Sequence, residues 1–184
     1  LQEACRQMIE FQAMGLDLPK VSVNVSALQF NKSFIARVGE VLHETALKPS
    51  RLELELTEGI MMDDTDATIN ALDELKEMGV SLSIDDFGTG YSSLSRLHNY
   101  PVRTVKVDCS FVERIDDSSN PSNQLLKTIQ NLCADLGLDS TAEGVETDSQ
   151  SAWLVQNGYK HGQGNLFSRP MSVAATAHYL AEIH

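Results

Sequence analysis

The chain has 184 residues, of which 42% are hydrophobic, and this is enough for one globular domain or a large part of one. Its formal charge is −12 and its pI is near 4.7. These values argue against binding to polymeric DNA or RNA, because phosphate contacts need clustered Lys and Arg, but a small anionic ligand could still bind through metal ions.

Cysteine and histidine spacing gives no sign of a disulfide framework or a zinc site. The three cysteines are odd in number and lack CxxC spacing, and the five histidines are scattered without HxxxH spacing. This usage is typical of the reducing cytosol, so we expect a cytoplasmic domain. No apolar run approaches the ~20 residues of a membrane span. A membrane anchor elsewhere in a longer parent protein is compatible with this sequence.

The predicted elements alternate between strands and helices along the chain. Residues 1–11 form part of an amphipathic helix with neither an initiator Met nor an N-cap residue, which predicts that the sequence starts partway through its domain. The clearest later helices are predicted at 64–78 and 123–136, each ended by a glycine. The apolar stripe of the second comprises Leu125, Leu126, Ile129, Leu132, Cys133 and Leu136. Strands are predicted at 21–26, 52–57, 80–85, 104–108, around 140–142 and around 159–163. This order predicts βα units and a parallel sheet.

Apolar and polar residues alternate within these strands, which favours a barrel. In a βα barrel the apolar face packs against outer helices, and the polar face brings Asn24, Glu55, Asp85 and Lys106 together near the carboxyl ends of the strands. An open sheet with one solvated face would also alternate, but it would not explain why metal-ligand and phosphate-binding residue types stand at the strand ends.

The number of predicted strands is too small for a closed barrel. About six are predicted, whereas a closed eight-unit barrel usually takes more than about 200 residues. The expected fold class is therefore α/β, a modified (β/α)8 barrel of the TIM type that is incomplete at its N-terminus.

Two adjacent carboxylates, Asp85 and Asp86, follow a short apolar strand and enter a glycine-broken loop. Neighbouring Asp side chains repel at neutral pH unless a cation lies between them or one is protonated, so the pair predicts a metal bridge. The structural alternative is an Asx turn that caps the next helix.

Six motifs in this order resemble the EAL family of cyclic di-GMP phosphodiesterases, bacterial signalling domains built on a modified βα barrel. They are NVS at 24–26, ELTE at 55–58, DDFGTGYSSL at 85–94, VKVD at 105–108, AEGVET at 142–147, and QG with LFSRP between 163 and 170. The resemblance covers essentially all of residues 1–184 and implies one EAL domain, represented by the C-terminal three quarters, roughly, of its barrel.

The resemblance implies a site for two divalent ions. Asn24, Glu55 and Asp85 would hold the first, and Asp85 would share the second with Asp86 and Glu143. Such oxygen ligands suit Mg²⁺ or Mn²⁺. With these ions the domain would hydrolyse one phosphodiester of cyclic di-GMP and release linear pGpG.

Further roles follow from the same resemblance. Lys106 would orient the attacking water or a phosphate oxygen, unless it is a surface lysine that snorkels. Glu58 would steady the loop after the Asp pair, and Gln163 would contact water or substrate. Glu146 would lie near the second metal or in the outer shell of its ligands, unless it is a carboxylate favoured by a helix N-terminus. The catalytic candidates are thus Lys106, Glu143, Glu58 and Gln163.

The sequence departs from the family pattern in two places. The Glu-Ala-Leu triplet and the Arg that follows it in active members are absent; the resemblance assigns them to a strand upstream of residue 1. We therefore expect residues 1–184 alone to be inactive. Asn165 stands where most relatives carry an aromatic residue, a change that affects either guanine packing or only surface shape.

Two other functions are compatible with the sequence: a catalytically inactive cyclic di-GMP receptor or regulatory EAL domain, and a scaffold. A scaffold has no need to keep the predicted ligands together. By the resemblance we also expect a homodimer through the helix that follows Asp86, at about 92–98, and a possible GGDEF or sensor domain outside this chain.

Overall fold

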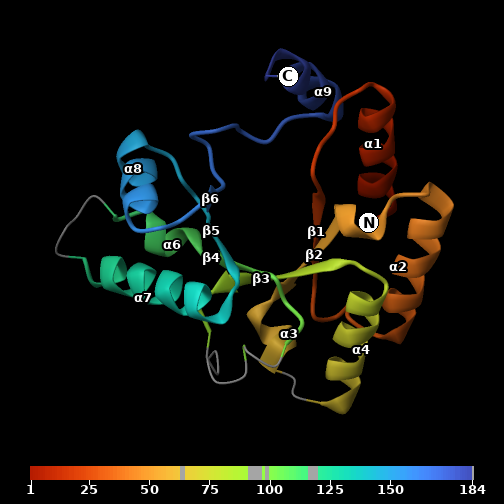
Figure 1. Ribbon diagram of the computed structural model, residues 1–184, viewed down its shortest axis with the longest axis horizontal. Helices are drawn as coiled ribbons and strands as arrows, with labels where there is room; N and C mark the ends of the chain where they lie inside the picture. Colours follow the sequence, from red (N-terminus) through yellow and green to blue (C-terminus); the bar gives the residue numbers. More distant parts are fainter. Residues whose placement is uncertain (63–64, 91–96, 98–99, 116–119, 184) are drawn as a thin grey trace. The chain divides into compact units, whose positions relative to one another are not determined.

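The computed structural model describes residues 1–62, 65–90, 97, 100–115 and 120–183 (Figure 1). They fall into two compact units. Unit 1 comprises Leu1–Leu56, Asp63–Leu82 and Met171–His184, and unit 2 comprises Thr57–Met62 and Ser83–Pro170. Each unit combines parallel strand pairs with helices, as expected for an α/β protein.

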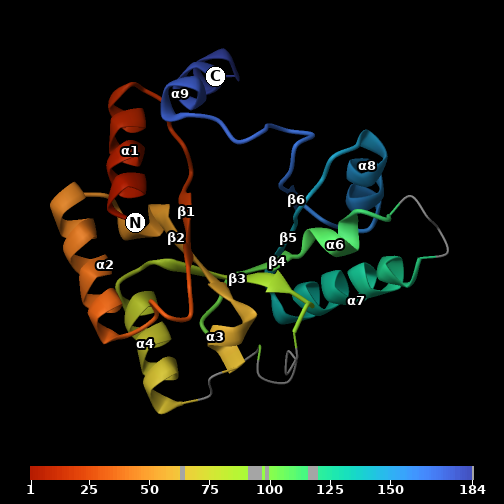
Figure 2. The same cartoon turned by 180° about the vertical axis from the view of Figure 1, so that it is seen from behind.

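Unit 1 holds one parallel strand pair and most of the N-terminal helices. Its elements are α1 (Gln2–Ala13), β1 (Val21–Val25), α2 (Lys32–Thr45), the 3₁₀ helix η1 (Pro49–Arg51), β2 (Leu52–Thr57, whose last residue belongs to unit 2), α4 (Asp66–Glu77) and α9 (Val173–Ile183). Helix α2 packs against both α1 and α4, as the two opposite views show (Figures 1 and 2). At the C-terminus, Leu180 of α9 joins Phe11 and Leu16 in a small apolar cluster.

Unit 2 is a four-stranded parallel arrangement with helices between its strands. It contains α3 (Glu58–Met62), β3 (Ser81–Phe87, whose first two residues belong to unit 1), β4 (Thr104–Val107), α6 (Cys109–Val112), α7 (Pro121–Leu136), β5 (Asp139–Ala142), α8 (Asp148–Gln156) and β6 (His161–Gly162). The strands pair in chain order from β3 to β6. Helix α7 packs against β5 and α6.

The predicted strands are confirmed, with differences at their ends. Strand β3 continues two residues beyond the predicted end at Asp85, and β6 is limited to His161–Gly162. The polar residues of β2 and β4 are buried: Glu55 is 5% exposed and Lys106 is 4% exposed. The described residues of these strands therefore do not form the solvated face of the open-sheet alternative.

Helix α7 begins two residues earlier than predicted, and its predicted stripe is partly wrong. Leu126, Ile129 and Cys133 are buried, but Leu125 is 38% exposed. Successive residues on a helix are separated by about 100°, so two adjacent leucines cannot both face the centre of the same contact. Among the described residues, helices with the length and apolarity needed to cross a bilayer are absent.

We expect Leu126→Ala to lower the free energy of unfolding by about 2–5 kcal/mol, because it leaves a cavity at a fully buried position. Leu125→Ala is the matched control. Its half-exposed side chain should change the free energy of unfolding by about 0.5 kcal/mol. Urea denaturation followed by circular dichroism checks both, and equal losses in the two variants would contradict the assignment of the buried face.

Candidate functional site: an acidic cluster around a buried lysine

The two adjacent carboxylates lie on an irregularity in β3. The register between β3 and β4 shifts by one residue between Ile84 and Phe87, so two residues of β3, Asp85 and Asp86, stand opposite Lys106 alone. Asp86 has a φ of +54°, in the left-handed region that Asp tolerates better than most residues. In a regular strand these neighbours would point to opposite faces, whereas a bulge can turn both toward one side.

The bulge places the Asp pair beside a third carboxylate. One oxygen each of Asp85, Asp86 and Glu143 lies within 4.8 Å of the other two. Glu143 directly follows β5, and its backbone N–H donates to the carbonyl of Val107 (3.1 Å), which continues the β4–β5 ladder to the carboxyl ends of the strands. Three carboxylate oxygens at this separation fit a hard divalent cation such as Mg²⁺ or Mn²⁺.

Lys106 lies beside two of the three acids of this cluster, Asp85 and Glu143. Its Nζ is 2.6 Å from Oε1 of Glu143 and 3.5 Å from Oδ1 of Asp85. Only 6% of the lysine side chain is exposed, and the Asp85 side chain is 13% exposed. The alternative of a surface lysine is therefore wrong, because the ammonium group lies between two acidic groups away from bulk water.

Desolvation and, after it, neighbouring negative charge disfavour ionisation of Asp86. Burial raises the pKa of the Asp86 carboxyl above its usual range, the charges of Asp85 and Asp108 raise it further, and Lys106 opposes them. Asp108 was not among the predicted site residues, although its place at the end of a strand could have indicated it. Its side chain caps α6 by accepting a hydrogen bond from the backbone N–H of Ser110 (3.0 Å).

Glu58 holds the loop that follows the Asp pair. One of its carboxylate oxygens, Oε2, accepts hydrogen bonds from the backbone N–H groups of Gly88 (3.3 Å) and Gly90 (3.2 Å). The Glu58 side chain is buried, and a Cβ on Gly90 would lie 2.7 Å from its other oxygen. A side chain at position 90 would therefore push the Glu58 carboxylate away from its place beside the loop.

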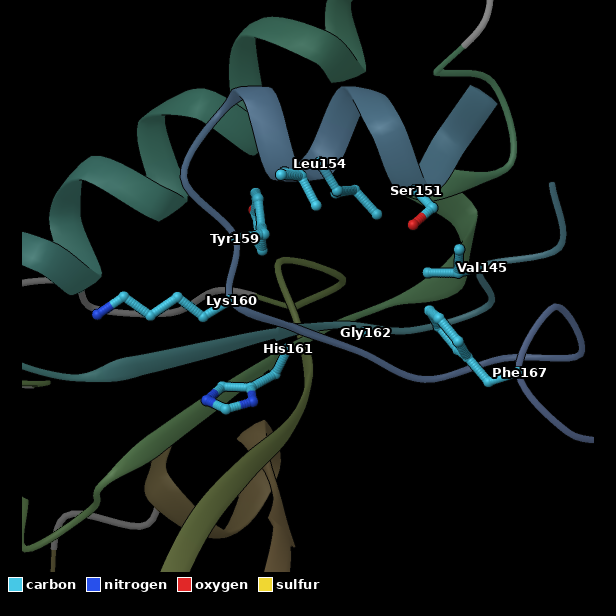
Figure 3. Close-up of a pocket in the computed structure, with 9 residues that line it drawn as sticks. Val145, Ser151, Leu154, Tyr159, Lys160, His161, Gly162 and Phe167 are labelled. Atoms are coloured by element: carbon cyan, nitrogen blue, oxygen red, sulfur yellow. The ribbon is translucent and has the colours of Figure 1, made fainter. Parts of the chain in front are cut away.

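Gln163 follows β6 in a loop that is bonded to the loop after Glu143. The N–H of Val145 donates to the carbonyl of Gln163, and the N–H of Leu166 donates to the carbonyl of Val145, both at 3.0 Å. A Cβ on Gly164 would lie 2.2 Å from the Val145 carbonyl oxygen, so only glycine permits this contact. Figure 3 shows Phe167 beside Val145, where the two help to line a cavity of about 360 Å³.

Glu146 lies outside the group of three acids. It precedes Thr147, the N-cap of α8, and the acidic residue of the first helical turn is Asp148. Glu146 therefore stands at the N-terminus of α8, and the alternative of a carboxylate favoured by the helix dipole stays open. One oxygen of Glu146 accepts a hydrogen bond from the side-chain amide of Asn165 (3.2 Å).

The remaining two predicted ligands meet within unit 1. Asn24 of β1 stands directly opposite Glu55 of β2 in the parallel register. The structure thus brings the predicted ligands together in two groups, Asn24 with Glu55 in unit 1, and Asp85 with Asp86, Glu143 and Lys106 in unit 2. The predicted dimer helix at about 92–98 lies outside the described residues, apart from residue 97.

Comparison with known proteins decides the family. A family model for the EAL domain matches residues 1–170. The chain belongs to the EAL domain family. The cyclic di-GMP phosphodiesterase NbdA of Pseudomonas aeruginosa is 41% identical over 181 residues, covering 98% of this chain and 23% of NbdA. The chain thus spans about a quarter of the length of the curated relatives that it matches.

Solved structures of EAL domains share the fold. The phosphodiesterase MucR of P. aeruginosa, in complex with c-di-GMP, superposes with a TM-score of 0.90 at 40% identity over 95% of this chain and 71% of that chain. The Klebsiella pneumoniae protein BlrP1, in a complex with manganese and c-di-GMP, gives a TM-score of 0.79 at 30% identity over 92% of this chain and 44% of that chain. The expected fold class, α/β of the EAL type, is confirmed.

The charge balance at Asp86 predicts a stability effect in the absence of metal. Because the pKa of Asp86 is raised in the folded protein, the folded protein keeps this proton to higher pH than the unfolded chain does. The free energy of unfolding therefore falls as the pH rises from the pKa of the unfolded chain to that of the folded protein. The Asp86 side chain is exposed, so solvent screens its charge and the gain is at most about 1 kcal/mol. At neutral pH, Asp86→Asn should therefore raise the melting temperature in EDTA by no more than about 2–4 °C.

Thermal unfolding in EDTA and in Mn²⁺ measures this effect. Asp73→Asn, which removes an exposed carboxylate of α4, is the control and should not raise the melting temperature. Mn²⁺ should stabilise the unsubstituted protein and Asp73→Asn more than Asp86→Asn, which lacks one ligand of the second ion. An unchanged or lower melting temperature of Asp86→Asn in EDTA would show that the carboxylates do not repel as inferred.

Proposed function

We propose that this EAL domain hydrolyses one phosphodiester bond of cyclic di-GMP and releases linear pGpG. The observation that carries the proposal is the meeting of three carboxylate oxygens around a buried lysine at the carboxyl ends of parallel strands, the end of the strands where βα enzymes place their chemistry. The similarity to NbdA and MucR, named as phosphodiesterases for this dinucleotide, supports the substrate.

We assign the ligands in two sets. Asn24, Glu55 and Asp85 would hold a first divalent ion, and Asp85 would share a second with Asp86 and Glu143. Amide and carboxylate oxygens suit Mg²⁺ or Mn²⁺, and the manganese complex of BlrP1 supports this choice. When bound, two such ions supply Lewis acidity at the phosphoryl group and a lowered pKa of water.

The remaining residues orient the reactants. Lys106 is a compact cation fixed between Glu143 and Asp85. It is suited to hold the attacking water or a phosphoryl oxygen by a charge-assisted hydrogen bond. Glu58 acts through the backbone of the loop at 88–90, which it keeps in one conformation. Gln163, at the end of β6, offers an amide to the substrate or to a water beside it, and Glu146 lies in the outer shell of the second ion.

The direct test is hydrolysis of cyclic di-GMP by the full-length protein in Mg²⁺ or Mn²⁺, followed by chromatography. We expect pGpG as the product and no turnover in EDTA. Tight binding of the dinucleotide without turnover would instead identify the catalytically inactive receptor, and neither binding nor turnover would reject the proposal. The same assay on residues 1–184 alone tests the expectation that they are inactive.

Lys106→Ala should lower kcat by at least about 100-fold, the usual range for loss of a group that positions or transfers protons in the reaction. The control is Lys127→Ala, which removes a lysine of α7 that lies over the Trp153 ring at 5.6 Å. Steady-state kinetics should show normal kcat in this control. A Lys106→Ala variant that folds normally, by circular dichroism, and keeps its kcat would exclude a catalytic lysine.

The setting of the domain is a further part of the proposal. We propose that it acts in the cytoplasm, which suits the free thiols of Cys5, Cys109 and Cys133. We also propose a homodimer through the helix after Asp86 and a GGDEF or sensor domain in the same protein. The name of MucR, a bifunctional diguanylate cyclase and phosphodiesterase, supports the attached GGDEF domain.

A further inference from the structure

Asn165 makes a contact that an aromatic residue at its position could not make in the same way. Its Nδ2 donates a hydrogen bond to Oε1 of Glu146 (3.2 Å) across 19 residues of sequence. The amide is a short donor group close to the backbone, whereas the ring of an aromatic side chain has no donor at this distance from its Cα. The contact therefore depends on the side-chain amide at position 165.

The backbone on the Glu146 side of this contact is fixed independently. The N–H groups of Glu146 and Thr147 both donate to Oε1 of Gln150, at 2.7 and 3.0 Å. Gln150 is 5% exposed, and its own amide donates to the carbonyl of Val112 (3.3 Å) at the end of α6. With its backbone held in this way, the main freedom left to Glu146 is rotation of its side chain.

The backbone on the Asn165 side is fixed as well. Gly164 lies against the backbone of Val145. The backbone of Val145 also forms hydrogen bonds with Gln163 and Leu166, which flank Gly164 and Asn165. Figure 3 shows Phe167 of the same loop beside Val145 and Gly162. Two fixed backbones thus carry one hydrogen bond between exposed side chains, which holds the Glu146 carboxylate toward the loop at 163–167.

We propose that Asn165 is a positioning residue for Glu146, and that it fixes this carboxylate for the divalent ion held by Glu143. The inference rests on the proposed function, which places Glu146 in the outer shell of the second ion. It adds a role for the loop at 163–167: the segment that offers Gln163 to the substrate also orients a group beside the metal. Metal affinity and substrate contact are then set by one pair of bonded loops.

The test is Mn²⁺ binding to the full-length protein by calorimetry, without nucleotide. Asn165→Leu, which keeps the size but removes the donor, should weaken Mn²⁺ binding about tenfold, as is typical for residues that orient metal-site groups. Asn165→Tyr should weaken it to a similar extent. Glu146→Ala should also weaken it, and adding Asn165→Leu to Glu146→Ala should cause no further loss, because Asn165 acts through Glu146.

Ser168→Ala, in the same loop, is the control and should bind Mn²⁺ normally, since its hydroxyl donates only to the neighbouring Arg169 carbonyl. Melting temperatures in EDTA establish that each variant is folded. Unchanged Mn²⁺ affinity in Asn165→Leu, or full additivity in the double variant, would overturn the inference and leave the proposed phosphodiesterase intact. Absence of Mn²⁺ binding by the unsubstituted protein would overturn both.

Discussion

The rest of the site depends on mutual repulsion between carboxylates that are held closer together than they would lie in water. Asp85, Asp86 and Glu143 bring three acidic groups within a few ångströms, and the buried ammonium group of Lys106 offsets only part of their charge. Such an arrangement costs folding free energy that the apolar core must supply. A divalent cation would turn the same repulsion into binding energy, which is why the cluster is best understood as a metal site.

Local backbone geometry makes this cluster possible. The extra residue in β3 and the left-handed conformation of Asp86 allow two neighbouring carboxylates to reach one side of the sheet. Glycine at position 164 then allows its loop to approach the backbone of Val145 more closely than any side chain would permit, and glycine at position 90 leaves room for the Glu58 carboxylate. Each departure from regular structure occurs within a few residues of a group with a proposed chemical role.

Much of this arrangement could be predicted from the sequence, and the failures have physical reasons. The alternation of polar and apolar residues within β4 predicts that Lys106 shares a face with the acids. This prediction needs only the sequence of the strand, because successive side chains of a strand point to opposite faces. Regular alternation along β3 would instead point Asp86 to the face opposite Asp85. The bulge that changes this depends on how β3 pairs with β4, which the sequence of β3 alone does not reveal. The hydrogen bond between Asn165 and Glu146 and the charge of Asp108 beside Asp86 were missed because both depend on tertiary contacts. Leu125 was wrongly predicted to be buried, because a broad run of apolar residues on α7 does not show which of them faces the middle of the contact.

The attachment of the loop at 88–90 has a mechanical consequence. A single carboxylate oxygen of Glu58 receives both glycine amides, so the two bonds share one anchor. Loss of that oxygen would therefore remove both bonds together, so one carboxylate at the start of α3 decides whether the backbone at 88–90 stays attached.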